Sequence, residues 1–339
     1  MTKILAIGNA ICDVLYEVTD EVITKLNLVK GSMTLCNVEQ INDIIASLNN
    51  ICNDFVLSSG GSAANTAYIL KMQNIETAFL GNVADDFYGK KYALEMADIG
   101  VEFINGRSSL NSDTAKSIIL ITPDGERTMC TYLGCASNIK VPNNLLDKFQ
   151  DLEYIYLEGY LWDNDLAVQE IIPLIKEARK KNIKIVFSLS DSFCVSRNLE
   201  KFKDLFKEDI DIIFANEEEI NSFFAINISE LDYASLIQNQ FNNNNIAYIV
   251  ITRNDKGSCI ISKNDQIEIP TRKLAAIDST GAGDSFAAGF LAKILKTNDL
   301  SEAASNANFI AGQVIMNIGA RPGKIEVNNN LGLYNEANN

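Results

Sequence analysis

Short apolar runs rich in Ile, Val and Phe alternate along the chain with longer stretches in which apolar residues recur at helical spacing. This alternation is typical of strands that helices cover on both faces, so it predicts an α/β protein. The candidate strands are Lys3–Gly8, Phe55–Ser58, Thr77–Gly81, Tyr154–Glu158, Lys184–Leu189, Ile210–Ala215 and Ala247–Thr252. The candidate helices between them include Val38–Asn49, Ala64–Met72, Leu166–Lys181 and Glu217–Phe224.

Two stretches, Val14–Leu35 and Asp113–Leu133, interrupt this alternation. Both have the pattern of extended strands without an intervening helix, and the second contains the turn signal Pro123-Asp124-Gly125. We expect the two stretches to pair into a small sheet that covers the main domain. The alternative is a pair of surface hairpins with no functional role.

Composition and charge exclude several classes of function. The 339 residues are 47% hydrophobic, which is ample for a sizeable core. The chain has no His, which excludes a Ser-His-Asp or Cys-His catalytic pair and His-ligated zinc or haem. With 29 Lys and Arg against 44 Asp and Glu, the net charge of −15 repels a phosphate backbone, so we expect no nucleic-acid partner. No segment approaches the roughly 18 apolar residues of a membrane span, so we expect no membrane partner.

The seven cysteines are scattered and contain no C-x-x-C pair. This pattern indicates neither a disulfide framework nor a zinc site, and it favours a reducing, cytoplasmic location. The apolar start of the chain is interrupted by Gly8 and Asn9 and followed by Asp13, so it does not have the pattern of a secretion signal.

The most informative segment is Asp278–Asp284, with the sequence DSTGAGD, which precedes a helical pattern of small and apolar residues. Two glycines at a helix N-terminus leave backbone amides open to an anion, and phosphate is the natural occupant. A carboxylate beside bound phosphate is repulsive, so Asp284 is better explained as a base that accepts a proton from a hydroxyl group. The alternative is an Asp that caps an ordinary buried helix.

Two further signals lie near the start of the chain. Gly60 and Gly61 follow a predicted strand and precede a predicted helix, which lets a polar ligand touch the backbone, and Asn65 faces the same side one turn later. Asn9 and Asp13 follow the first strand, where a carboxylate can accept hydrogen bonds from two neighbouring hydroxyls of a sugar. Each signal alone is equally consistent with a simple turn. No Rossmann or P-loop glycine motif occurs in the sequence.

Together these motifs resemble the ribokinase-like (PfkB) family of sugar and nucleoside kinases, over nearly the entire chain. Asp278–Asp284 is similar to its carboxy-terminal signature, with Ser279 where Thr is commoner. Ser59–Asn65 resembles the family's amino-terminal glycine pair, and Asn216–Glu219 resembles its Asn-x-x-Glu element. Thr252–Gly257 is similar to the turn that borders the nucleotide. Within the family, the chain is most similar to bacterial adenosine kinase-like members, on the basis of Ser62, Gly125–Met129 and Glu158–Asp163.

The resemblance implies a single ribokinase-like domain over residues 1–339. Its fold is a three-layer α/β/α domain with a mostly parallel central sheet. The small β-sheet formed by about residues 14–35 and 113–133 is inserted into this domain as a lid. Family lids are either free or used for dimerisation, so both a monomer and a homodimer are compatible with the sequence.

The resemblance also assigns roles to individual residues. Asp284 is the catalytic base, and Gly281, Ala282 and Gly283 form the anion hole. The acceptor-binding residues are Asn9, Asp13, Gly60, Gly61 and Asn65, with Arg127 on the lid reaching a phosphate or the 5′ end of a nucleoside. The nucleotide-binding residues are Asn216, Thr252, Gly257 and Asn308. Glu219 acts on Mg²⁺ through water. Candidates for an apolar slot that holds a purine are Ile11, Met33, Met129 and Phe193, and ordinary core packing is the alternative for each of them.

The implied function is transfer of the γ-phosphoryl group of ATP to a hydroxymethyl group of a nucleoside, with adenosine as the preferred acceptor. The implied cofactors are ATP and Mg²⁺, and some relatives build a monovalent-cation site near the anion hole. Two alternatives stay open. One is a sugar kinase of the same family, of the ribokinase or fructokinase type, and the other is a nucleoside-binding protein without catalytic activity.

Overall fold

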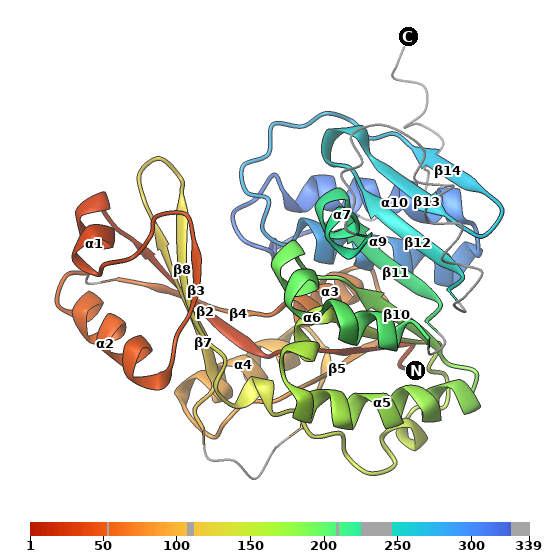
Figure 1. The fold of residues 1–339 in the computed structure, drawn as a ribbon, viewed down its shortest axis with the longest axis horizontal. Coiled ribbons are helices and arrows are strands. Elements are labelled where there is room, and N and C mark those ends of the chain that lie inside the picture. Colours follow the sequence, from red (N-terminus) through yellow and green to blue (C-terminus); the bar gives the residue numbers. More distant parts are fainter. Residues whose placement is uncertain (53, 107–111, 208–209, 225–245, 327–339) are drawn as a thin grey trace.

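A large sheet forms the centre of the molecule (Figure 1). The computed structural model describes residues 1–52, 54–106, 112–207, 210–224 and 246–326, and within these residues the sheet has nine strands. In spatial order they are β14 (Gln266–Ile269), β13 (Ser258–Ile261), β12 (Tyr248–Thr252), β11 (Ile212–Asn216), β10 (Lys184–Ser188), β9 (Tyr154–Glu158), β1 (Ile4–Ile7), β5 (Thr77–Gly81) and β6 (Glu102–Asn105). The strands from β12 to β6 are parallel, and β13 is antiparallel to both neighbours. The residues that follow the parallel strands therefore meet at one edge of the sheet.

Helices cover both faces of the large sheet, which gives three layers. The helices on one face are α5 (Asp165–Lys180), α6 (Ser192–Leu205) and α7 (Glu217–Phe224). Those on the other face are α3 (Ser62–Met72), α4 (Phe87–Asp98), α9 (Ala282–Thr297) and α10 (Leu300–Val314). Short 3-10 helices are η1 (Gly134–Ser137), η2 (Leu145–Lys148), η3 (Gly159–Asp163) and η4 (Asn254–Lys256). The predicted α/β class is confirmed.

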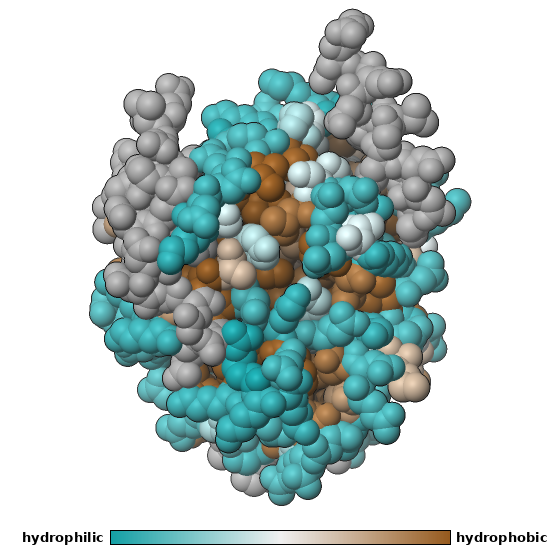
Figure 2. Space-filling view, turned by 90° about the vertical axis from the view of Figure 1, so that its right-hand side faces the viewer, coloured by the Kyte–Doolittle hydropathy of each residue, from teal (hydrophilic) through white to brown (hydrophobic). Residues whose placement is uncertain are grey.

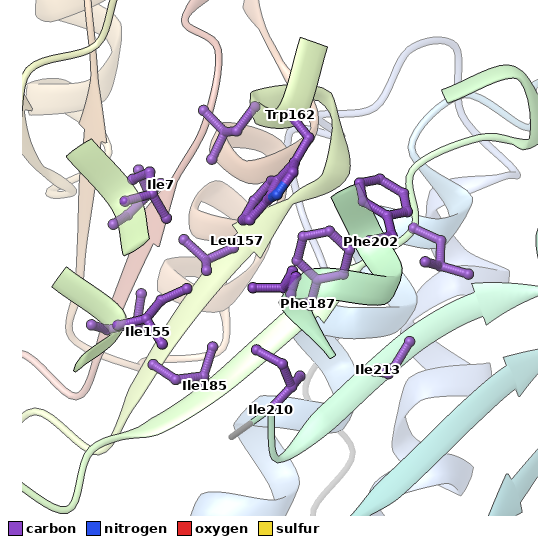
Figure 3. Close-up of a cluster of buried hydrophobic side chains, with 14 of the residues drawn as sticks. Ile7, Ile155, Leu157, Trp162, Ile185, Phe187, Phe202, Ile210 and Ile213 are labelled. Atoms are coloured by element: carbon purple, nitrogen blue, oxygen red, sulfur yellow. The ribbon is translucent and has the colours of Figure 1, made fainter. Parts of the chain in front are cut away.

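The core between the large sheet and helices α5 and α6 combines aliphatic strand residues with aromatic rings (Figure 3). Phe187 on β10 lies between Trp162 and Phe202, with ring centroids 4.9 and 5.1 Å away in edge-to-face geometry. All three side chains are fully buried. Edge-to-face pairs add directional packing to the burial of apolar area. This core fixes the positions of β9 and β10 at the edge of the sheet where they end.

A second, smaller sheet projects from one side of the molecule (Figure 1). Its strands, in spatial order, are β3 (Met33–Leu35), β8 (Arg127–Tyr132), β7 (Ala115–Ile121), β2 (Ile11–Glu17) and β4 (Val56–Gly60). Because β2 pairs with β7 and β3 pairs with β8, the segments 14–35 and 113–133 lie side by side. Helices α1 (Asp20–Lys25) and α2 (Val38–Asn49) cover one face, where Ile41 and Leu48 pack in the same core as Ile118.

Helix α1 corrects the prediction that Val14–Leu35 contains only extended strands. Val22 and Ile23 are buried on one side of this helix. Asp20 and Glu21 in the first turn and Lys25 in the last turn have the charges that the helix dipole favours. A helix of six residues contains less than two turns of helical period, so the apolar pattern did not reveal it.

The prediction of a buried strand at Phe55–Ser58 was also wrong in its placement. Residues 56–58 of this segment belong to β4, an edge strand of the small sheet, and Val56 is 64% exposed. A short apolar run has the same composition whether one or both of its faces are covered, so composition alone did not identify the sheet to which it belongs. Helix α2, predicted between strands of the main sheet, likewise packs on the small sheet.

Figure 2 shows the side of the molecule that lies away from the small sheet. Hydrophilic residues cover much of this side, and hydrophobic residues are visible between them. Within the described part of the chain, no helix has both the length and the apolar character needed to cross a membrane.

Candidate active site

The turn between β4 and α3 brings several predicted acceptor-binding residues together. Gly61 is the N-cap of α3 and has a φ of +97°. A Cβ at this position would lie 2.1 Å from the carbonyl oxygen of Asn9, so only glycine permits the approach. A Cβ on Gly60 would lie 2.3 Å from a carboxylate oxygen of Asp13 on β2. The turn therefore joins Asn9 and Asp13 to the start of helix α3.

We expect Gly61→Ala to lower the free energy of unfolding by more than about 2 kcal/mol, because strain at positive φ adds to the clash with Asn9. The matched control is Gly125→Ala. Gly125 also has a positive φ, of +84°, but its Cβ would meet no atom within 4 Å. This control should lose only the backbone strain, about 1 kcal/mol. Denaturant unfolding compares the two variants, and equal losses would show that the clash is absent.

Asp13 lies on β2 opposite Ser58 of β4 and Ser117 of β7. Burial raises the pKa of its carboxyl group to about 7, although the positive charges of Arg321 and Arg127 act in the other direction. When ionised, this carboxylate has two oxygens that can accept hydrogen bonds from neighbouring hydroxyl groups. Asp13 is thus able to bind a diol, and its charge changes close to neutral pH.

Asp284 lies in the first turn of α9 and is bound by two side chains of α3. The Ser62 hydroxyl donates to its Oδ1 at 2.6 Å, and the Asn65 amide nitrogen donates to its Oδ2 at 3.0 Å. Burial raises the pKa of Asp284 above its ordinary value, despite these hydrogen bonds and the positive charge of Arg321. A carboxylate with a raised pKa, held in a fixed orientation, is suited to accept a proton.

The start of α9 presents backbone amides beside Asp284. Gly281 is the N-cap, with a φ of +74°, and a Cβ there would lie 2.4 Å from the Cβ of Ala320. Gly283 is exposed, and a Cβ on it would meet no atom within 4 Å. Amides in the first turn of a helix lack acceptors within the helix and attract anions. Residues Gly281, Ala282 and Gly283 therefore form a turn next to a carboxylate that is suited to bind an anion, and within it the amide of Ala282 also donates to the carbonyl oxygen of Ser279 at 3.1 Å.

Arg127, on strand β8 of the small sheet, contacts the beginning of the same motif. Its guanidinium group donates to the carboxylate of Asp278, and to Oγ1 of Thr280 at 2.5 Å. Asp278 also accepts a hydrogen bond from the backbone nitrogen of Gly319 at 2.6 Å. Burial by itself would raise the pKa of Asp278, but hydrogen bonds from Gly319 and Thr280 and the charge of Arg127 lower it. Arg127 thus links the small sheet to the glycine motif through protein groups, and its predicted contact with a phosphate stays a prediction.

Asn216 and Glu219 form a closed pair at the end of β11. Both oxygens of Glu219 accept from Asn216, one from its backbone nitrogen at 3.0 Å and one from its amide nitrogen at 2.7 Å. The pKa of Glu219 is raised to about 7, mainly by burial and also by the charges of Asp191, Glu218 and Asp284, against the effect of the backbone hydrogen bond from Asn216. Thr252 lies opposite Asn216 at the end of β12. Three residues that were predicted to bind the nucleotide or its Mg²⁺, Asn216, Glu219 and Thr252, therefore meet at the edge of the sheet where the parallel strands end.

The arrangement at Glu219 is compatible with Mg²⁺ that arrives bound to a nucleotide. Among the described residues, no group of three or more Cys, Asp or Glu side chains is arranged to hold a metal ion. Such a cage is unnecessary for Mg²⁺, which keeps several waters and is held by one or two carboxylates plus substrate phosphates. Because both oxygens of Glu219 already bind Asn216, a contact through water fits this residue better than direct coordination.

Gly257 and Asn308 lie near the end of β14. Gly257 has a φ of +91°, and a Cβ on it would lie 2.1 Å from the carbonyl oxygen of Ile269. Asn308 on α10 donates to the carbonyl oxygens of Ile269 at 3.3 Å and Pro270 at 3.4 Å. Both residues therefore hold the segment that leaves β14, and their predicted contact with a nucleotide stays a prediction.

Comparison with known proteins identifies the family. The sequence profile of the pfkB family of carbohydrate kinases matches residues 24–327. The chain belongs to this family. It is 25% identical over 336 residues to adenosine kinase of Saccharomyces cerevisiae, covering 93% of this chain and 95% of that protein. Its fold is similar to that of adenosine kinase from Sinorhizobium meliloti (30% identity, TM-score 0.81) and of a probable sugar kinase from Rhizobium etli (29% identity, TM-score 0.82), with 95% of this chain and 96% of each structure covered.

As a pfkB kinase, the chain is a phosphotransferase that acts on an alcohol group. The predicted family and the ribokinase-like fold class are confirmed. The family implies ATP as the phosphoryl donor and typically the use of Mg²⁺.

In the structure, two residues contact the candidate site that the sequence motifs did not mark as site residues. Glu158 at the end of β9 is buried and accepts from the backbone nitrogens of Asn9 at 2.7 Å and Ala63 at 2.8 Å. Burial raises the pKa of its carboxyl group to about 7, against the effect of these two hydrogen bonds. The strand pattern located Glu158 but did not reveal its contacts. The second residue, Arg321, lies in a segment that carries no sequence motif.

Proposed function

We propose that the chain phosphorylates the hydroxymethyl group of a nucleoside, with adenosine as the preferred acceptor and ATP as the donor. The observation that carries this proposal is the setting of Asp284. Its carboxylate is bound by Ser62 and Asn65 of helix α3. The turn before this helix contains Gly60, which lies against Asp13. A proton acceptor, an anion-binding helix terminus and a diol-binding carboxylate thus share one site.

The face of the small sheet that carries Asp13 supports a nucleoside rather than a free sugar. Side chains two residues apart on a strand share a face, so Leu15 lies beside Asp13 on this face. The register continues the apolar row across the sheet, with Leu15 opposite Ile119, Ile119 opposite Met129, and Met129 opposite Met33. This row offers apolar surface to a purine base next to a carboxylate for the ribose hydroxyls. The similarity to two adenosine kinases over more than nine-tenths of the chain points in the same direction.

In the proposed reaction, the acceptor hydroxyl oxygen attacks the γ-phosphorus of ATP in line with the leaving oxygen of ADP. The hydroxyl proton passes to Asp284, the new O–P bond forms as the bond to ADP breaks, and ADP leaves with the electron pair. The amides of Gly281, Ala282 and Gly283 stabilise the charge on the transferring group. In a loose transition state the proton leaves late, so Asp284 need not be strongly basic.

The donor side of the proposed site uses Asn216, Thr252, Gly257 and Asn308. Mg²⁺ bound to ATP supplies charge screening for the phosphates, and Glu219 would contact it through water. We propose that the small sheet acts as the lid, with Arg127 joining it to the phosphate-binding turn. A closed lid excludes water, which limits wasteful hydrolysis of ATP. A cytoplasmic location and a role in purine salvage belong to the same proposal.

A substrate panel tests the acceptor. Release of ADP is followed in a coupled assay with adenosine, guanosine, inosine, ribose and fructose, and we expect adenosine to give the highest kcat/KM. The similarity to a probable sugar kinase supports the alternative of a sugar kinase, and preference for ribose or fructose would replace the nucleoside assignment by it. Calorimetric binding of a nucleoside without any product after long incubation with Mg-ATP would instead favour a binding protein without catalytic activity.

A further inference from the structure

The four residues from Gly319 to Pro322 follow α10 in the chain. They contact residues of the candidate active site on both the α9 and the α3 side. The backbone nitrogen of Gly319 donates to Asp278, and Ala320 lies directly against Gly281. The carbonyl oxygen of Pro322 accepts from the Tyr68 hydroxyl at 3.1 Å, which anchors the segment to α3. The segment therefore supports both the phosphate-binding turn and the acceptor side of the site.

Arg321 is the charged residue of this segment. Its Nε donates to Oδ1 of Asn65 at 2.9 Å, and one terminal nitrogen donates to the carbonyl oxygen of Gly60 at 3.4 Å. Its guanidinium group lies over the ring of Tyr68, 5.4 Å from the centroid. The planar fork of an arginine side chain thus spans both ends of the β4–α3 turn, and the stacked ring limits its movement.

These contacts determine which way the Asn65 amide faces. Because its oxygen accepts from Arg321, its nitrogen is directed to Asp284, to which it donates at 3.0 Å. An amide with the opposite orientation would present its oxygen to a carboxylate, which is repulsive. Arg321 therefore acts on Asp284 through one intervening side chain, without touching the reacting atoms.

The charge of Arg321 acts on the same carboxylate. Other titratable groups that face Asp284 are Tyr156 and Glu158 on β9 and Glu219 on α7. Each of them becomes negatively charged when it loses its proton. Asp13 on β2 adds a further carboxyl group on the acceptor side. Arg321 opposes the rise in pKa of both Asp13 and Asp284. Without a positive charge at this point, burial and the surrounding acids would hold Asp284 protonated over a wider pH range.

We propose that Arg321 is a positioning residue for phosphoryl transfer, which orients Asn65 and Gly60 through its fork and supplies a positive charge that acts on Asp284. This inference rests on the proposed function, because it assigns Arg321 to the base and the acceptor side of that site. It predicts two separable effects, one from the fork geometry and one from the charge.

Arg321→Met and Arg321→Lys separate the two effects, with Lys324→Met as the control for loss of one exposed charge two residues beyond the segment. We expect Arg321→Met to lower the plateau of kcat about tenfold and to move the acid limb of the kcat profile upward by about one pH unit. Arg321→Lys keeps the charge and loses the fork, so it should lower the plateau and leave the acid limb in place. The KM for ATP should change little in either variant, and Lys324→Met should match the wild type.

The acceptor in this experiment is whichever compound of the panel the wild type phosphorylates. A wild-type plateau and acid limb in Arg321→Met would overturn the proposal, as would a loss of activity that only follows the folded fraction. Should Arg321→Met fail to fold, Arg321→Lys decides alone, and a wild-type plateau in that variant overturns the proposal.

A measurement without turnover separates this inference from the proposed function. Aspartate carboxyl carbons labelled with ¹³C are titrated by NMR, and Asp284→Asn assigns the Asp284 signal. We expect this signal to titrate about one pH unit higher in Arg321→Met than in the wild type. If no acceptor is phosphorylated, the proposed function fails while this shift still supports the role of Arg321. An unchanged titration overturns that role even if the kinase activity is present.

Discussion

Replacement of Asp284 by Asn is expected to lower kcat by about a hundredfold to ten-thousandfold, the range typical of a lost general base. The amide group cannot accept the hydroxyl proton, although it fills the same space. Its oxygen can still accept from Asn65, and its nitrogen can donate to the Ser62 hydroxyl, so both partners of Asp284 stay bound. The loss should therefore appear in kcat, while the KM values for acceptor and ATP change little. Steady-state kinetics with saturating ATP measure it.

Stability provides an independent check on this variant. Burial raises the pKa of Asp284 in the folded protein, so its ionisation opposes folding as the pH rises through the folded pKa. Asn cannot ionise, and Asp284→Asn should therefore be more stable than the wild type at about pH 8 and lose this advantage at about pH 4. Thermal unfolding at the two pH values measures the difference.

Asp204→Asn is the matched control, because the side chain of Asp204 is 74% exposed at the end of α6 and has no contact with the site. It should retain wild-type kcat. Wild-type turnover in Asp284→Asn would remove Asp284 from the mechanism. A large loss of both turnover and stability would instead identify it as a structural cap of α9.

The sequence predicted the parts of this site that depend on local backbone geometry. The glycines at 281 and 283 indicate an open helix terminus because the relevant contacts lie within one turn, and the same holds for the glycine pair before α3. Six of the nine strands described in the large sheet, β1, β5 and β9 to β12, were predicted for a similar reason, since a strand covered on both faces is a continuous apolar run. These features could be predicted because each depends on residues that are close together in the sequence. The outer strands β6, β13 and β14 were not predicted.

The remaining features depend on contacts between distant segments. The hydrogen bond from Ser62 to Asp284 joins residues 222 positions apart, and the one from Arg321 to Asn65 joins residues 256 apart. Neither pair has a spacing that a single sequence reveals. For Arg127 the motif indicated a position on the small sheet, whereas its contact with Asp278 depends on where that sheet lies relative to the segment before α9. An isolated arginine in a sequence has no local pattern that shows whether it is a site residue or a charge on the surface.

Asp13→Asn is expected to raise the KM for the acceptor by about tenfold to a hundredfold, because hydrogen bonds to a charged group contribute about 1.5 to 3 kcal/mol. Asn fills the same space against Gly60, so the turn should keep its shape. The kcat at saturating acceptor should change less, since Asp284 and the α9 amides are intact. An unchanged KM for every acceptor of the panel would show that the hydroxyl groups are bound elsewhere.

The pH dependence of acceptor binding distinguishes Asp13 from its acidic neighbour. With a pKa of about 7, Asp13 is protonated at lower pH and accepts fewer hydroxyl hydrogen bonds, so the wild-type KM should rise as the pH falls below about 7. Glu158 also has a pKa of about 7, but its oxygens bind the amides of Asn9 and Ala63. A dependence that persists in Asp13→Asn would show that another buried acid, Glu158 or Glu219, is responsible.

Hydroxyl donors favour the carboxylate over the neutral acid, so binding of the acceptor should lower the pKa of Asp13 and release protons below about pH 7. Calorimetric titrations in two buffers of different ionisation enthalpy measure this release directly, because the heat of buffer protonation adds to the heat of binding. The wild type should give different heats in the two buffers, and Asp13→Asn should give equal heats. Equal heats in the wild type would mean that Asp13 does not bind the acceptor through its ionised form.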